Sequence, residues 1–474
     1  MSAAAAVAVS PAAIQGTLID KPMIKAHMAF GFLFFIVALL AGLLYGLQLT
    51  NIYPFPGIEL LSPGRIRMLH TNAVAFGFLI NVFIAMLHWV VPRLTGHPML
   101  HPMLSRLILV AWQLVVAATA VGILAGYAQA IEWGETPLLV DHFAVLGVAL
   151  LVINVGSSIW KTGGKKLYVT LWYFTAMLIW TPLVYIMGNY LPQYFVPGAG
   201  GAAITGVYIH DLVGLSVTPL GWGMMYYFVP VLLEKPIWSH TLSILGFWGL
   251  AFFYPLNGVH HFFYSPIPMY AQYGAVVSTI AVELVVFTVI INFFMTLRGR
   301  GDRLRTSMAT RWFFVGMVNY FITCLQCAFH TTLTFQKVIH FTDWVVGHAH
   351  LVMLGVFGFW LVGGIVYMWP KVTGRDWWSQ KLLGWTFWTS VIGLVIMFID
   401  LTAAGLVQGY MWIGLAQWEK TLAASMPFWH ARTFAGSLIT LGMCLQAYNM
   451  WMTARSPAPA SKPADAPSGA TAPV

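Results

Sequence analysis

The chain alternates long apolar stretches with short polar connections from near its beginning to near its end. Twelve of these stretches are long enough to cross a bilayer, because a helical span needs about 20 mainly apolar residues. The predicted spans are 25–49, 64–92, 104–130, 139–161, 166–191, 202–233, 239–264, 268–298, 307–333, 341–369, 379–408 and 428–453. The pattern therefore predicts an all-α, polytopic membrane protein with twelve transmembrane helices.

The two ends of the chain do not share this pattern. Residues 1–20 are Ala-rich and lack the basic leader and cleavage site of a signal peptide, so we expect a flexible amino-terminal segment. Residues 456–474 are rich in Pro, Ala and Ser and predict a disordered tail. The remaining residues, 21–455, form one predicted domain of twelve helices. No internal repeat is visible by inspection, which weighs against the inverted-repeat transporters.

The composition supports membrane insertion. Only 8% of the residues are charged and the mean hydropathy is +0.79, whereas a soluble domain has about 25% charged residues. The net charge of +9 would suggest nucleic acid in a soluble chain, but here it serves to orient the spans, and we expect no nucleic-acid partner. Three cysteines are too few for a disulfide framework, and Cys324 and Cys327 form a C-x-x-C followed by Ala rather than by the His of covalent c-type haem attachment.

The basic residues test the number of spans. With both termini in the cytoplasm, 18 of the 23 Lys and Arg fall on the cytoplasmic side, as the positive-inside rule expects. The exceptions are Arg65, Arg67, Lys337, Lys420 and Arg432. This asymmetry favours an even number of spans with both ends cytoplasmic.

Six histidines lie at similar depths within the predicted spans once the topology is applied: His70, His210, His260, His261, His348 and His350. A helix rises 1.5 Å per residue, so all six share one layer roughly 6–14 Å below the outer surface. A single histidine in a span is usually a core residue bonded to a carbonyl group. Six in one layer indicate a functional site, because ionisable groups inside a membrane are costly.

The spacing of the histidines divides them into separate centres. His348 and His350 lie two residues apart and leave opposite faces of a helix, about 200° apart, so one helix can serve two centres. The adjacent His260 and His261 can converge on one ion if Pro255 and Gly258 loosen their helix. With His210 they form a three-imidazole set suited to copper, iron or zinc. His70 and His350 then suit a six-coordinate haem, and His348 a five-coordinate haem.

With these motifs in this order, the chain resembles the catalytic subunit of the haem–copper oxidases, and most closely their C family, the cbb3-type cytochrome c oxidases. The resemblance covers about 25–453. It is carried by Arg67 to Asn72, by His210 followed by Gly223 to Pro230, by His260 and His261, and by Thr342 to His350, with support from Gln408 to Trp412 and from Pro370 to Val372.

The resemblance implies roles for single residues. His70 and His350 would bind a low-spin haem b, His348 a high-spin b-type haem, and His210, His260 and His261 a copper ion. Tyr254, six residues before His260, matches the active-site tyrosine of the family, although an ordinary packed aromatic is the alternative. Arg67 would pair with a haem propionate. Glu132 and Glu135 resemble an acidic loop that can hold calcium, with a solvated loop as the alternative.

Two departures from the family keep a second function open. Gln326 stands where the family usually has a glutamate, and Glu283 lies in a span where an apolar residue is expected. Nitric oxide reductases of the same superfamily have a glutamate near the site in that span. They also use a glutamate four residues after the first metal histidine as an iron ligand, and this chain has Gly214 there.

The resemblance thus implies a respiratory oxidase in a bacterial inner membrane that reduces dioxygen to water and is coupled to proton uptake and translocation. Electrons would come from cytochrome c through membrane-anchored c-type cytochrome subunits, in a complex with other small membrane subunits. Tyr226, Tyr227 and Ser243 lie on the inner halves of their spans and could lead protons toward Tyr254, or simply bond helices together. Glu283 and Gln326 are further candidates for this proton path. A nitric oxide reductase and, more remotely, a twelve-span transporter are the alternatives.

Overall fold

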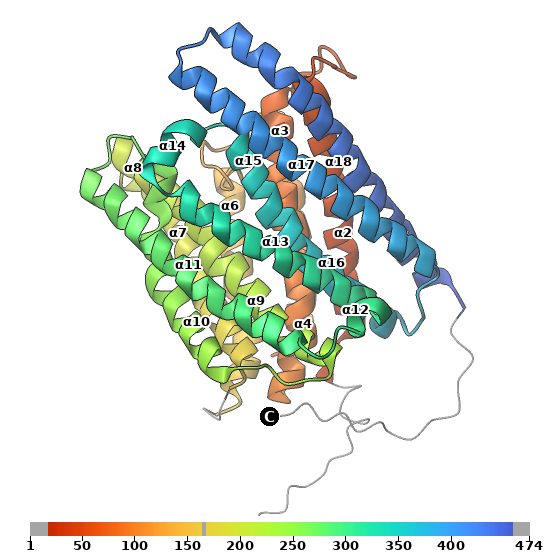
Figure 1. Cartoon of the computed structure of the whole chain (residues 1–474). Helices are drawn as coiled ribbons and strands as arrows, with labels where there is room; N and C mark the ends of the chain where they lie inside the picture. Colours follow the sequence, from red (N-terminus) through yellow and green to blue (C-terminus); the bar gives the residue numbers. More distant parts are fainter. Residues whose placement is uncertain (1–17, 164–166, 458–474) are drawn as a thin grey trace, which may run out of the picture.

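The computed structural model describes residues 18–163 and 167–457, and within these ranges the chain is helical without β-strands (Figure 1). The predicted flexible segment and disordered tail lie almost wholly outside the described residues. The helical elements are α2 (Lys21–Leu49), η1 (Glu59–Leu61), α3 (Pro63–Asn72), η2 (Ala73–Ile80), α4 (Asn81–Thr95), α5 (Pro102–Ala125), α6 (Leu138–Trp160), α7 (Val169–Tyr194), α8 (Gly198–Leu212), η3 (Val213–Val217), α9 (Thr218–Leu233), α10 (His240–Phe253), η4 (Tyr254–Leu256), η5 (Gly258–Phe262), α11 (Met269–Leu297), α12 (Arg303–Thr306), α13 (Met308–His330), α14 (Leu333–Ile339), α15 (Asp343–His350), η6 (Leu351–Gly358), α16 (Phe359–Thr373), α17 (Gln380–Ile413) and α18 (Trp418–Arg455).

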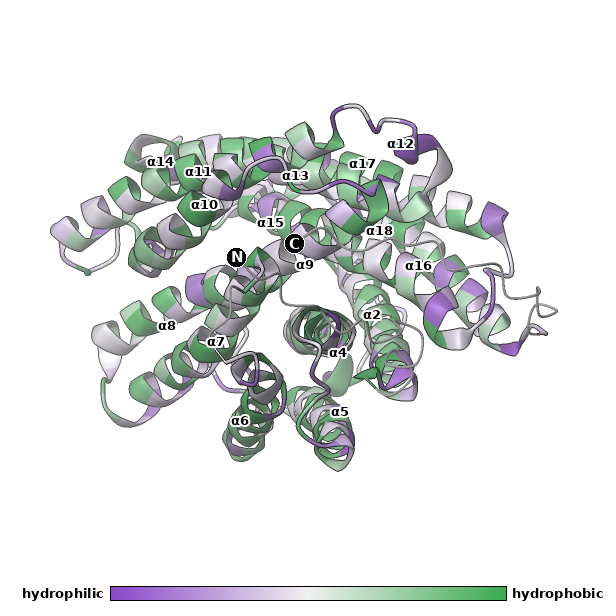
Figure 2. Cartoon of the chain, turned by 90° about the horizontal axis from the view of Figure 1, so that it is seen from below, coloured by the Kyte–Doolittle hydropathy of each residue, from purple (hydrophilic) through white to green (hydrophobic). Residues whose placement is uncertain are grey.

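The all-helical membrane fold predicted from the sequence is confirmed. Among the described residues, eleven helices are long and apolar enough to cross a membrane. The segment predicted as the twelfth span lies in α18, which packs along α17 and α2 but is less apolar than the other eleven. The count of twelve and the cytoplasmic position of both ends stay predictions. Figure 2 shows hydrophobic residues along the helices and hydrophilic ones gathered at connections such as α12.

Three spans form the inner part of the bundle and share one plan. They run over Pro63–Thr95, Gly198–Leu233 and Asp343–Thr373, and 83%, 94% and 78% of their apolar windows are buried. Each contains a π-helical segment, η2, η3 or η6. Such widened turns are rare and are often found at functional sites.

The shared plan reveals an internal repeat, so the expectation of no repeat is wrong. His70, His210 and His350 are each 140 residues apart and lie shortly before a π-helical segment. Each inner span then ends on a left-handed residue whose N–H bonds the carbonyl of a proline four residues earlier, at Gly96, Glu234 and Gly374. The repeat is one of position and geometry, and few side chains are shared, which is why inspection of the sequence missed it.

Candidate haem and metal sites

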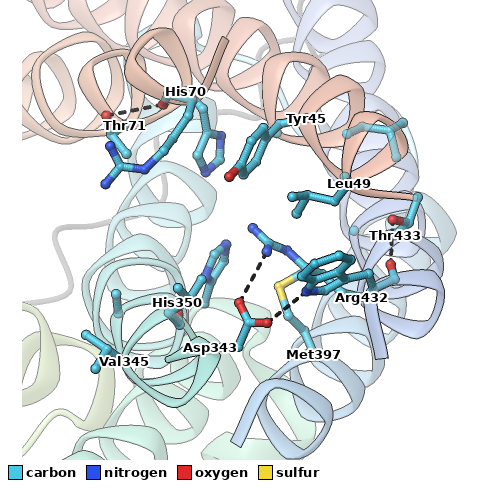
Figure 3. A pocket seen from close by; sticks show the side chains of 18 of the residues that line it. Tyr45, Leu49, His70, Thr71, Asp343, Val345, His350, Met397, Arg432 and Thr433 are labelled. Atoms are coloured by element: carbon cyan, nitrogen blue, oxygen red, sulfur yellow. Dashed lines mark hydrogen bonds and ion pairs between the residues drawn. The ribbon is translucent and has the colours of Figure 1, made fainter. Parts of the chain in front are cut away.

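A large cavity opens between α3 and α15, and His70 and His350 face each other across it (Figure 3). Its volume is about 730 Å³, within the range of cofactor pockets, about 300–1,000 Å³. The two imidazole rings have their centroids 6.1 Å apart, with 22° between the ring planes. Two imidazoles that bind one metal ion from opposite sides, at metal–nitrogen distances of about 2.1 Å, have centroids about 6 Å apart. The pair therefore fits a six-coordinate haem iron.

Hydrogen bonds orient both rings for this role. The Nδ1 of His70 lies 2.7 Å from the carbonyl oxygen of Ala38, and the Nδ1 of His350 lies 2.8 Å from that of Val346. A carbonyl oxygen only accepts, so each Nδ1 carries the hydrogen and each Nε2 keeps a free lone pair for a metal. Gly42 leaves room for the His70 ring, since a Cβ at that position would lie 2.7 Å from the ring nitrogen.

Two arginines line the same cavity. Arg67 forms an ion pair with Glu132 at 3.0 Å, and Arg432 lies 3.8 Å from Asp343. Asp343 is held in turn by Gln408 and Trp429, which donate hydrogen bonds of 2.6 and 2.8 Å to its Oδ2. Sequence reasoning missed Arg432, although it was one of only five basic residues predicted on the outer side.

A second centre lies where α8 meets η5. His210, His260 and His261 offer nitrogen atoms that all lie within 4.8 Å of one another. The Nε2 of His210 is buried without a hydrogen-bond partner, and the Nδ1 of His260 lies 2.9 Å from the hydroxyl of Thr279. A buried, unpartnered imidazole nitrogen beside two other imidazoles is a donor set that fits copper, zinc or iron.

The local break in the helix brings the adjacent histidines together. The α-helix α10 ends at Phe253, and two short 3₁₀ segments, η4 and η5, follow around Pro255 and Gly258. This confirms the loosening predicted from those two residues. A Cβ on Gly258 would lie 2.4 Å from the backbone of Val207, so glycine allows η5 to approach α8.

Tyr254 lies against this set of histidines. Its ring stacks on that of His210, with centroids 4.4 Å apart and 15° between the planes. The ring also fills the space beside Gly214, because a Cβ there would lie 1.5 Å from Tyr254. No side chain, and so no glutamate ligand, fits at position 214 while Tyr254 keeps this place.

His348 leaves α15 on the side away from the large cavity, as its spacing from His350 predicts. Its Nδ1 lies 3.0 Å from the side-chain oxygen of Gln326, and its ring stacks on Trp344 at 5.8 Å. Gln326 thus holds the ring orientation through the nitrogen that a metal would leave free. His330, which sequence reasoning did not select, packs edge-on against His348 at 5.2 Å. A histidine at the end of a predicted span was the only signal.

The residues of the candidate proton path lie in separate parts of the structure. Asn292 bonds both the hydroxyl of Tyr226, at 3.4 Å, and that of Ser243, at 3.2 Å. Tyr227 instead lies near Arg93 and Trp89. Glu283 is buried on α11, its Oε2 has no hydrogen-bond partner, and its carboxyl group faces the thiols of Cys324 and Cys327.

The acidic loop places its two glutamates in different surroundings. Glu132 is half exposed and paired with Arg67, whereas Glu135 is buried and accepts a hydrogen bond of 2.8 Å from Asn72. Burial raises the pKa of Glu135 to about 7, and the bond from Asn72 opposes this shift.

The buried Glu135 predicts a pH dependence of stability. The folded chain binds the proton of the Glu135 carboxyl group more tightly than the unfolded chain does. The contribution of this proton to the free energy of unfolding is therefore present below the ordinary pKa of 4.5 and is lost as the pH rises through 7. With calcium chelated, Glu135→Gln should flatten the fall in Tm between these values, as measured by thermal unfolding in detergent. A variant that keeps the unaltered pH profile would show that Glu135 does not contribute.

These observations define an all-helical membrane protein whose inner spans, together with η5, carry histidines grouped so that they can bind metals. A family model described as "Cytochrome C and Quinol oxidase polypeptide I" matches residues 23–438, and the chain belongs to this family. Cytochrome c oxidase subunit 1 of Rhodobacter capsulatus is 31% identical over 443 residues, covering 88% of this chain and 82% of the relative. The cbb3-type cytochrome c oxidase subunit CcoN1 of Stutzerimonas stutzeri is 30% identical, covering 90% of this chain and 93% of the relative.

More distant proteins share the fold. A subunit of the nitric oxide reductase of Stutzerimonas stutzeri is 24% identical over 488 residues, covering 94% of this chain and 98% of the relative. A solved heme-copper terminal oxidase dimer matches with a TM-score of 0.77 at 16% identity, over 92% of this chain and 84% of that one. The family resemblance drawn from the histidine motifs is confirmed.

Proposed function

We propose that this chain is the catalytic subunit of a cbb3-type cytochrome c oxidase, which reduces dioxygen to water and is coupled to proton uptake and translocation. The observation that carries this proposal is the stacking of Tyr254 on His210. It brings a phenol ring into contact with a three-histidine metal set, and the ring also fills the space that a glutamate ligand at position 214 would need.

In this proposal, each group of residues binds one cofactor. His70 and His350 hold a low-spin haem b, with Arg67 and Arg432 placed for its propionates. His348 holds a high-spin b-type haem, and His210, His260 and His261 hold copper. When bound, these groups supply the redox chemistry, namely electron transfer and the binding and reduction of dioxygen.

The side chains of this chain supply orientation and protons. Tyr254 gives a proton and an electron at the reacting centre. Gln326 orients His348 through Nδ1, and Thr279 orients His260 in the same way. Orienting partners of this kind keep the ligating nitrogen aimed at the metal.

Protons reach this centre from the cytoplasmic side. Ser243 and Tyr226, joined by Asn292, form the lower part of the path. Glu283, buried with a free oxygen, forms the upper part and lies next to Cys327, whose thiol is 3.7 Å from His348. Tyr227 belongs to this path only if water connects it, because it lies near Arg93 and Trp89 instead.

The partners follow from the missing c-type haem motif. Electrons come from cytochrome c through membrane-anchored c-type cytochrome subunits, and small membrane subunits complete the complex. The complex lies in a bacterial inner membrane. Glu132 and Glu135 hold a calcium ion near the propionates, for which their carboxylate oxygens are suitable ligands.

A nitric oxide reductase is the second candidate, and Glu283 is the observation that favours it. Glu283 is buried at mid-span with one oxygen unpartnered, in the span where those reductases have a glutamate near the site and an oxidase is expected to have an apolar residue. The lack of space at position 214 opposes an iron site with a glutamate ligand.

Replacing a histidine of the triad tests the copper assignment. His260→Ala should lose copper while keeping the low-spin haem, because His70 and His350 lie on other helices. Metal analysis and visible spectra of the purified complex measure both. Thr279→Val, which removes only the orienting hydroxyl, should keep the copper with a smaller loss of activity, typically 10–100-fold for such outer groups. Full copper occupancy in the His260→Ala protein would disprove the triad.

A further inference from the structure

A second pair of histidines is buried beneath the large cavity, away from every site described above. His27 on α2 and His88 on α4 are 0% and 2% exposed. Their ring centroids lie 6.0 Å apart, with 30° between the planes. In the predicted topology, both lie near the cytoplasmic ends of their spans.

The hydrogen bonds of His27 fix its tautomer. Its Nδ1 lies 3.1 Å from the Oδ1 of Asn81. That oxygen also accepts a bond of 2.7 Å from Gln113, while the amide nitrogen of Asn81 donates to the carbonyl oxygen of Gly77. Because Oδ1 accepts, His27 donates from Nδ1, and its Nε2 carries a bare lone pair. This Nε2 is buried and has no partner.

His88 has the same tautomer for the same reason. Its Nδ1 donates to the carbonyl oxygen of Ile84 at 2.9 Å, so its Nε2 accepts from the hydroxyl of Ser105 at 3.2 Å. Asn154 donates to that hydroxyl oxygen at 2.9 Å, which leaves the Ser105 hydrogen free for His88. Two neutral imidazoles thus present basic nitrogens in one buried region.

An unpartnered acceptor inside a protein is unfavourable until a donor reaches it. Either a water molecule or a proton satisfies the Nε2 of His27. A bound proton would make His27 a donor, and the neighbouring His88 would then resist a second one because like charges repel. The pair therefore suits the binding of a single proton.

Few charges act on this pair. Among the described residues, the ionisable groups that act on the two rings are the rings themselves and Asp20. Asp20 caps α2 by accepting a bond of 3.1 Å from the backbone of Met23. Asp20 thus lies at the end of α2 that is cytoplasmic in the predicted topology, on the side from which a proton would reach the pair.

Aromatic side chains lie between the pair and the cavity of His70 and His350. Phe35 on α2 and Phe78 on η2 stack at 3.9 Å, and both line the cavity. Along α2, His27 is opposite Asn81, Phe35 is opposite Phe78 and Gly42 is opposite His70. Little screening is expected across such side chains, so a change of charge in the cavity acts on the histidines beneath it.

We propose that His27 and His88 form a proton-binding site that takes up one proton from the cytoplasmic side when the haem held by His70 and His350 is reduced. One electron enters the iron, one proton binds an imidazole Nε2, and no other bond forms or breaks, so the net charge of this half of the bundle is unchanged. This inference rests on the proposed function, because it requires the low-spin haem.

The pH dependence of the low-spin haem potential tests the site. Spectroelectrochemical titration of the purified complex should show a midpoint potential that falls as the pH rises, and one full proton per electron corresponds to about 59 mV per pH unit. His27→Gln and His88→Gln should each flatten this slope while keeping the haem spectrum. His142→Gln is the matched control, since His142 is exposed and bonds only its own helix, at Leu138.

Two outcomes overturn the proposal. The first is a pH dependence of the haem midpoint potential that stays unaltered in both the His27→Gln and the His88→Gln variant, each of which retains the haem. If the variants do not assemble, infrared difference spectra of the unaltered complex with ¹³C-labelled histidine take their place. The second outcome that overturns the proposal is the absence of an imidazolium signal in these spectra when the haem is reduced. Absence of a low-spin haem from the unaltered complex would instead refute the proposed function, so the two failures are distinguishable.

Discussion

Tyr254→Phe should abolish dioxygen reduction while leaving both haems and the copper in place. The substitution keeps the ring that stacks on His210 and fills the space beside Gly214, and removes only the hydroxyl group. If that hydroxyl supplies a proton to the reacting centre, turnover should fall on the order of 10²–10⁴-fold, as for other groups that transfer protons in catalysis. Oxygen consumption by the purified complex, normalised to its haem content, measures the effect.

Tyr185→Phe is the matched control for this experiment. Tyr185 is also buried, but it packs away from the histidine triad and its hydroxyl donates to Asp141 at 2.5 Å. We expect this variant to keep most of its oxygen consumption. A Tyr254→Phe enzyme that loses only about two- or threefold in turnover, against the range above, would show that Tyr254 is a packed aromatic without a redox role.

His350→Ala and His348→Ala should remove different haems, although the two residues lie within one turn of α15. His350 faces His70 across the large cavity, whereas His348 bonds Gln326 on α13. His350→Ala should therefore abolish the low-spin haem bands and with them the entry of electrons, so turnover is lost. His348→Ala should keep these bands and disturb the high-spin centre.

Visible and magnetic circular dichroism spectra of the reduced complexes separate the two centres. Met353→Leu, a change of similar volume on the cavity wall, controls for general damage to this span and should keep both haems. If both histidine substitutions removed the same band and spared the other, the assignment of the two faces would be wrong.

The apolar spans and the opposite faces of His348 and His350 could be predicted because they depend on local rules. Span length follows from apolar runs, and the opposite faces of His348 and His350 follow from helix geometry alone. The break at Pro255 and Gly258 was visible for the same reason, since both residues disturb a helix wherever they occur.

Other features depend on contacts between distant segments, which the sequence does not display. Arg432 lies in the cavity because α18 packs beside α2, and His330 reaches His348 from the end of α13. Gly214 is explained only by the structure, in which the ring of Tyr254 occupies the space that a side chain at position 214 would need. The pairing of His27 with His88 likewise joins two spans whose register no local pattern fixes.

The metal and haem content of the purified complex tests the central claim most directly. Quantification of copper, total iron and extractable haem, normalised to this chain after correction for c-type haem in partner subunits, should give two b-type haems, one copper and no non-haem iron. Non-haem iron in place of copper, together with rapid reduction of nitric oxide and negligible reduction of dioxygen, would contradict the account and establish a nitric oxide reductase.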